Sequence, residues 1–108
     1  MKPTKKRNVV INRLERKRIL KHKLWRLRQY IHSIKQEDLL NEISQIVENI
    51  KFSRLSIMQN NGNVLRLSLN DNIRQKIYKI LLNRLIPLST SDSSFDDLIE
   101  EIKKKIKD

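Results

Sequence analysis

Residues 54–69 read RLSIMQNNGNVLRLSL, and this segment decides the fold class. Apolar and polar side chains alternate on both sides of an asparagine-rich centre, which holds the only glycine of the chain. Such alternation is typical of half-buried strands, and a short Asn/Gly segment between two alternating runs is typical of a hairpin turn. We therefore predict a β-hairpin in a chain whose other apolar residues follow helical spacing.

The register of this hairpin follows from its two faces. A two-residue turn would pair Met58 with Leu65, whereas a three-residue loop over 60–62 would pair Ile57 with Leu65. The three-residue loop gathers the apolar side chains on one face of the hairpin. It also places Gly62 at the left-handed backbone position that such a loop requires. We predict the three-residue loop.

Apolar residues recur at three- and four-residue intervals in the rest of the chain, which predicts helices over 9–34, 36–50, 71–86 and about 93–106. The predicted order is helix, helix, β-hairpin, helix, helix. This is an α+β fold, mainly helical, with a long basic N-terminal helix that projects from a small aliphatic body. Because an isolated hairpin is marginal in water, we expect the second and third helices to cover its apolar face.

The helix boundaries have local signals of their own. Ser33, three residues before Gln36, is typical of a capping box. It favours a tight turn at 33–36 and an antiparallel helix pair over one continuous helix, which remains an alternative. Asn70 or Asp71 can cap the third helix, and Pro87 ends it.

The net charge of +12 lies entirely in residues 1–35, which hold thirteen Lys or Arg and one acid. Residues 36–108 hold eleven charges of each sign. We therefore divide the chain into a flexible basic tail, 1–8, and a single small domain, 9–108. Within that domain, 9–34 form a cationic helical limb and 36–108 a charge-balanced body. Unpaired cations are costly to bury, so the limb is expected to project into solvent or to lie on a polyanion.

Composition excludes several other classes of protein. The chain has no cysteine, and its two histidines, His22 and His32, do not have the spacing of a zinc site. We find no phosphate-binding glycine loop and no catalytic constellation, and we predict neither a cofactor nor a metal nor enzyme activity. The absence of a long apolar run and of a signal peptide predicts an intracellular protein, cytoplasmic or organellar and not secreted, with no membrane partner. The complete lack of alanine, with abundant Ile, Lys and Asn, indicates an AT-rich genome.

A dense, nearly unopposed basic segment is typical of nucleic-acid binding, since arginine contacts phosphate through two donors and lysine adds point charge. We predict an RNA-binding component of a ribonucleoprotein particle, similar to a small ribosomal protein, that contacts the phosphate backbone through its N-terminal third. Trp25 can stack on an unpaired base. Alternatively, it can pack under the last helix of this protein, or it can contact a second protein. The candidate nucleic-acid-binding residues are Lys5, Lys6, Arg7, Arg13, Arg16, Lys17, Arg18, Lys21, Lys23, Trp25, Arg26 and Arg28.

Two alternatives remain open at the level of sequence. One is a DNA-binding accessory or regulatory protein of a phage or plasmid, with the third helix as the recognition helix. The residues of that helix suited to the role are Arg74, Gln75, Lys76, Lys79, Asn83 and Arg84. The other is an interaction module for an acidic protein, including other proteins of the same particle. No small-molecule substrate is expected in either case, and oligomeric state stays open.

Overall fold

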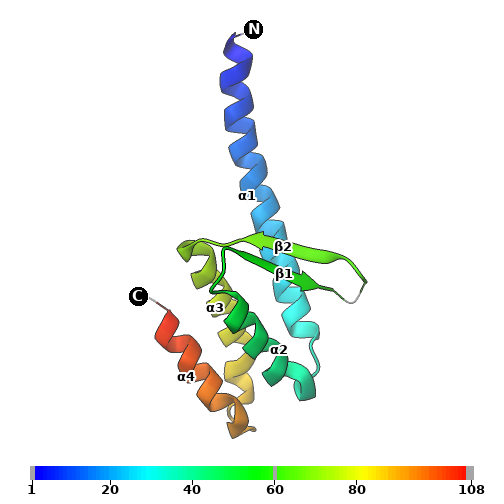
Figure 1. Cartoon of the computed structure of the whole chain (residues 1–108), viewed down its shortest axis with the longest axis vertical. Helices are drawn as coiled ribbons and strands as arrows, with labels where there is room; N and C mark the ends of the chain where they lie inside the picture. Colours follow the sequence, from blue (N-terminus) through cyan, green and yellow to red (C-terminus); the bar gives the residue numbers. More distant parts are fainter. Residues whose placement is uncertain (1, 60, 107–108) are drawn as a thin grey trace.

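The computed structural model describes residues 2–59 and 61–106, with side chains described from residue 13 onward. Four helices and a two-stranded antiparallel sheet follow in the order helix, helix, hairpin, helix, helix (Figure 1). This order confirms the predicted fold class. The elements are α1 Lys2–Ser33, α2 Gln36–Asn49, β1 Arg54–Met58, β2 Val64–Ser68, α3 Asp71–Leu85 and α4 Asp96–Lys105, with short 3₁₀ helices η1 Ile86–Leu88 and η2 Ser93–Phe95.

Helix α1 is continuous and gives the molecule its length. It begins at Lys2, seven residues before the predicted start, so the backbone of residues 2–8 is helical. The predicted flexibility of this basic tail stays a prediction. The side chains of residues 2–8 lie outside the described ones. The molecule measures 62 × 35 × 22 Å, and in Figure 1 the N-terminal part of α1 stands clear of the remaining elements. We call residues 2–19 the projecting part of α1.

The hairpin has the predicted register. Ile57 pairs with Leu65 and Leu55 with Leu67, and all four side chains are buried. The loop closes where the Gln59 N–H donates to the Asn63 carbonyl at 2.8 Å and the Gly62 N–H donates to the Gln59 carbonyl at 3.0 Å. Gly62 has a φ of +84°, which confirms the left-handed position.

Helices α1 and α2 cover the apolar face of the hairpin. Strand β2 lies against α1, and β1 lies against α2. The prediction is confirmed for the second helix, and α1 covers the face as well, which was not predicted. The buried side chains of α3 belong to the same core as those of the strands. The chain reverses at residues 34–35, and α3 packs between α1 and α4.

The core is almost entirely aliphatic, as the composition predicts. It joins every helix and both strands, and the described residues include no buried polar or charged residue. Only two aromatic side chains are buried in it, Phe95 at 2% exposure and Tyr78 at 7%. On α1 the buried residues are Leu27 and Ile31, with Leu20 and Leu24 packed at the edge of the core, and Ile34 is buried just after the helix ends.

The junction between α1 and α2 differs from the predicted capping box. Ser33 belongs to the last turn of α1, where its hydroxyl donates to the Tyr30 carbonyl at 2.6 Å. The residue at the N-cap of α2 is Lys35, whose side chain makes no capping hydrogen bond. A serine within a helix bonds back to the preceding turn, so it is no longer available to cap the next helix. Asn70, in contrast, caps α3 as predicted, accepting from the Ile73 N–H at 2.9 Å.

Two arginines of α3 close the C-terminal ends of α1 and α2. Arg84 donates from Nε to the Ile31 carbonyl at 3.3 Å and from Nη2 to the Ile34 carbonyl at 3.1 Å. Arg74 donates to the carbonyls of Ile50 and Phe52, at 2.9 and 3.1 Å. The last carbonyls of a helix lack intrahelical partners and carry partial negative charge, so a guanidinium satisfies both requirements.

We expect Gly62→Val to lower the free energy of unfolding by about 1–3 kcal/mol, because a β-branched residue is strained at this φ. A Cβ at Gly62 would meet nothing within 4 Å, so the cost is conformational and not steric. Gly62→Asn is the control, since asparagine tolerates the left-handed region and should cost less. Urea unfolding measures both variants, and equal stability of the valine variant and the native protein would contradict this account.

Arg84→Met should lower the free energy of unfolding by about 1–3 kcal/mol, because it leaves two carbonyls at the end of α1 without their charged donor. Lys79→Met on the same helix is the matched control. The Lys79 side chain is exposed and should change the unfolding free energy by under about 0.5 kcal/mol. Equal midpoints and slopes for the two variants in urea would show that the carbonyl contacts are not stabilising.

Candidate nucleic-acid interface

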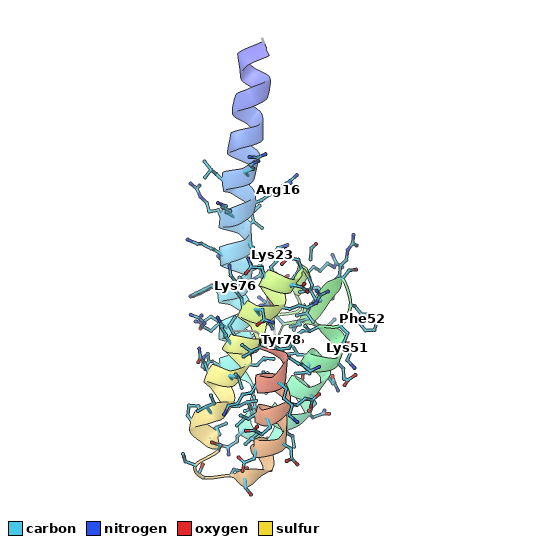
Figure 2. The ribbon with its side chains drawn as sticks, turned by 90° about the vertical axis from the view of Figure 1, so that its left-hand side faces the viewer. Arg16, Lys23, Lys51, Phe52, Lys76 and Tyr78 are labelled. Atoms are coloured by element: carbon cyan, nitrogen blue, oxygen red, sulfur yellow. The ribbon has the colours of Figure 1, made fainter. Side chains whose placement is uncertain are left out.

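The projecting part of α1 displays a dense set of exposed cations. Arg13, Arg16, Lys17 and Arg18 are exposed, and so is Lys21, three residues after Arg18 (Arg16 is labelled in Figure 2). Glu15 is the one acid in this stretch. No Lys or Arg within 13–35 forms an ion pair with another described residue, so this positive charge is not neutralised by the part of the protein that the structure describes.

The cations continue the stripe with which α1 enters the core. Arg13, Arg16 and Lys17 precede Leu20 by seven, four and three positions. At 3.6 residues per turn they therefore lie on the same side of α1 as Leu20 and Leu24. The side of α1 that is apolar along the body thus becomes cationic where the helix leaves it, and Arg18 and Lys21 extend the charge to other sides.

The other predicted binding residues are placed differently. Arg28 is exposed, and Lys23 and Arg26 are half-buried where α1 meets the body. Arg26 Nη2 donates to Gln59 Oε1 at the end of the hairpin, which joins α1 to the loop. The side chains of Lys5, Lys6 and Arg7 lie outside the described ones.

The body, although neutral in sum, separates its own charges. The first turns of α2 and α4 are acidic, with Glu37 and Asp38 on α2 and with Asp96 and Asp97 on α4. Figure 1 places both of these helix starts at the end of the molecule opposite the projecting part of α1. Helix α4 ends in the basic run 103–105 at the level of the hairpin.

The outer face of the hairpin adds two more cations at that level. Arg54 and Arg66 are exposed on it, from β1 and β2 respectively, and both lie on the solvent side of the sheet. The hairpin end of the body, which adjoins the projecting part of α1, therefore carries Arg54 and Arg66 together with one acid, Asp71 at the start of α3, while the acidic first turns of α2 and α4 face away.

Trp25 lies at the surface and not in the core. Its side chain is 56% exposed, which rules out packing under α4, and its ring stacks on that of His22 with centroids 6.1 Å apart. Trp25 lines an open groove of about 470 Å³ between α1 and the loop end of the hairpin. Arg26, Gln29, Gln59 and Asn61 line the same groove.

The chain matches no protein-family model, no curated protein and no solved structure. Within residues 2–59 and 61–106, no helix combines the length and the apolar character needed to cross a membrane. Across the same residues, no three His, Cys, Asp or Glu side chains come together in a way that could hold a metal ion.

One tyrosine beside the groove is held in its neutral form. The Tyr30 hydroxyl donates to Glu42 Oε2 at 3.4 Å, which ties α1 to α2. Burial raises the pKa of Tyr30, and the charge of Glu42 and the hydrogen bond to its carboxylate raise it further. The hydroxyl therefore stays protonated, and remains a donor, at neutral pH.

Sequence reasoning singled out the cations, Trp25 and the asparagines of the hairpin tip, but it missed Gln29 and Gln59 beside them. Gln29, Gln59 and Asn61 come from two segments about thirty residues apart in the chain, and only the packing of the hairpin across α1 brings them together. The asparagine-rich loop was a visible signal for Asn61. Nothing in the sequence indicates that Gln59 lies next to Arg26.

Deletion of residues 1–18 should leave the helical and sheet signals of the remainder unchanged and shift the free energy of unfolding by under about 0.5 kcal/mol. The reason is that residues 13–18 are all exposed, and the buried part of α1 starts at Leu27. Circular dichroism and urea unfolding of the truncated chain make the measurement. Loss of cooperative unfolding would mean that the projecting part supports the fold.

Proposed function

We propose that this protein binds RNA through the phosphate backbone, as a component of a ribonucleoprotein particle. The observation that carries the proposal is the set of five exposed cations, Arg13, Arg16, Lys17, Arg18 and Lys21, on about two turns of helix without an ion pair to any described residue. A helix charged on several sides contacts phosphates on more than one side, as it would inside folded RNA.

The arrangement of the whole molecule is compatible with this role. The charged part of α1 extends beyond the body, while its other half is fixed by burial of Leu27 and Ile31 at 0% exposure. A polyanion bound along the projecting part would also meet Arg54 and Arg66 on the hairpin face. The acidic end of the body would point away from it.

Binding of DNA through α3 has less support. Arg74 and Arg84, two of the residues that a recognition helix would need, donate to backbone carbonyls within the protein. A side chain used in this way is not available to read base edges in a groove. RNase or DNase digestion of the nucleic acid that copurifies with the protein separates RNA from DNA directly.

Joint replacement of Arg13, Arg16, Lys17, Arg18 and Lys21 by serine should weaken RNA binding on the order of 100-fold or more at moderate salt. Each cation held against a phosphate releases condensed counterions, so the salt dependence must change as well. The slope of log K against log salt should become shallower by up to about 4.5 on a duplex, or about 3.5 on single strands. Fluorescence anisotropy of a labelled RNA at several salt concentrations measures both quantities.

The matched control removes five charges elsewhere. Lys35, Lys51, Lys76, Lys79 and Lys103 are exposed lysines of the body and of the turn after α1, and we replace them together by serine. This variant has the same net charge as the first and should keep most of the slope. Equal losses in the two variants would mean that net charge alone drives binding. An unchanged affinity in the α1 variant would exclude the proposed function and favour the acidic-protein partner.

A further inference from the structure

The groove between α1 and the hairpin loop has a composition unlike that of the projecting part of α1. One side carries the Trp25 indole, with Arg26 and Gln29 from the same helix, and the other side carries Gln59 and Asn61 from the hairpin. Its volume of about 470 Å³ lies within the range of small-molecule sites. Tyr30 and Ser33 of α1 line it as well, so the groove combines two aromatic side chains, one guanidinium, three amides and the hydroxyl of Ser33, and none of its lining residues carries a carboxylate.

The indole is held by its neighbours in the helix. His22 and Trp25 are one turn apart, and their rings are stacked with an angle of 17° between the planes. This contact limits the rotation of Trp25 and leaves the side chain 56% exposed. An exposed aromatic ring with a restricted orientation is a suitable platform for a planar ligand, because little conformational entropy is lost on stacking.

The amides around the indole have free hydrogen-bonding capacity. Gln59 accepts from Arg26 through Oε1, which leaves its NH₂ group available. Asn61 accepts from the Asn63 N–H at 3.0 Å through Oδ1, which leaves its own NH₂ group available. Gln29 makes no hydrogen bond to another described residue, so it offers both a donor and an acceptor.

A cationic track leads from the projecting part of α1 to this groove. Arg18, Lys23 and Arg26 line a second open hollow of about 440 Å³ along α1, together with Ile19, His22 and one acid, Glu15. Arg26 borders both hollows. Figure 2 shows Arg16 on the projecting part and Lys23 lower on the helix, where it reaches the body. An RNA backbone that follows these cations arrives beside Trp25.

We propose that the groove binds one unpaired nucleotide of a structured RNA, with its base stacked on Trp25 and its polar edge bonded to the amides of Gln29, Gln59 and Asn61. The phosphates flanking that nucleotide lie on Arg26 and Lys23. This inference rests on the proposed function and adds to it a substrate class, an RNA with an unpaired loop or bulge. A base inside a duplex has both faces covered by its neighbours, so it cannot stack on a protein side chain.

Trp25 is the only tryptophan of the chain, so the intrinsic tryptophan fluorescence of the protein reports on this groove alone. The experiment compares an RNA hairpin carrying an unpaired loop with a fully paired RNA duplex of the same stem sequence. The hairpin should quench the Trp25 emission at saturation and bind more tightly than the duplex. The duplex should bind along the cations of α1 and leave the emission nearly unchanged.

Variants then assign the preference to the groove. Trp25→Ala should weaken binding of the hairpin RNA by about 5- to 150-fold, the range for loss of one stacked base, and leave duplex affinity and the salt slope unchanged. Trp25→Phe keeps a ring and should restore most of the affinity for the hairpin RNA. Gln29→Ala alters an exposed residue and gives a second comparison, with an expected loss of a few-fold for the hairpin RNA alone.

Phe52→Ala is the matched control, since this aromatic side chain is 64% exposed and lies before β1, at the end of the strand away from the loop (Figure 2). Phe52→Ala should change neither the affinity for the hairpin RNA nor the affinity for the duplex.

Equal quenching of the Trp25 emission by hairpin and duplex, or unchanged binding of the hairpin RNA by Trp25→Ala, would overturn the groove as a nucleotide site. If the five-cation α1 variant still loses affinity for both RNAs, the proposed function stands without it. If that variant binds both RNAs normally, the proposed function fails as well.

Discussion

The last turns of α1 hold the rest of the structure together. Leu27 and Ile31 are fully buried there, in contact with elements that come later in the chain, and Arg84 of α3 bonds to the carbonyls at the end of the helix. A two-stranded hairpin is marginal on its own, and β2 acquires its apolar support from this part of α1. The hairpin and α3 therefore both depend on a helix whose other half extends outside the body.

The limit between the buried and the projecting halves of α1 is set by composition and not by any break in the backbone. The helix is continuous from Lys2 to Ser33, and one side of it is cationic from Arg13 to Lys17 and apolar from Leu20 onward. Burial of the apolar residues fixes the helix, and the cost of desolvating unpaired cations keeps the other residues in solvent. The same two effects thus decide the fold and the exposure of the proposed RNA-binding surface.

Local signals predicted what depends on local geometry. The hairpin register followed from alternation and from Gly62, and the helix cap followed from Asn70, because each rests on residues close in sequence. The roles of Arg74 and Arg84 were not predictable, because the sequence pattern of an amphipathic helix is the same whether its arginine extends into solvent or donates to a carbonyl distant in the sequence. The burial of Phe95 and the groove beside Trp25 were missed for a similar reason: both depend on which helix packs against which segment.

The separation of charge within the body has a kinetic consequence. The first turns of α2 and α4 are acidic at one end, and the exposed cations of α1 lie at the other, so the charge of the molecule is distributed unevenly along its length. Such a distribution has an electric dipole. In the field of a polyanion such a dipole experiences a torque at distances within about a Debye length, roughly 8 Å at physiological salt. The protein would be turned with its basic end foremost before any contact forms. Fewer of its collisions would then be unproductive, and association would be accelerated without any gain in the strength of the final complex.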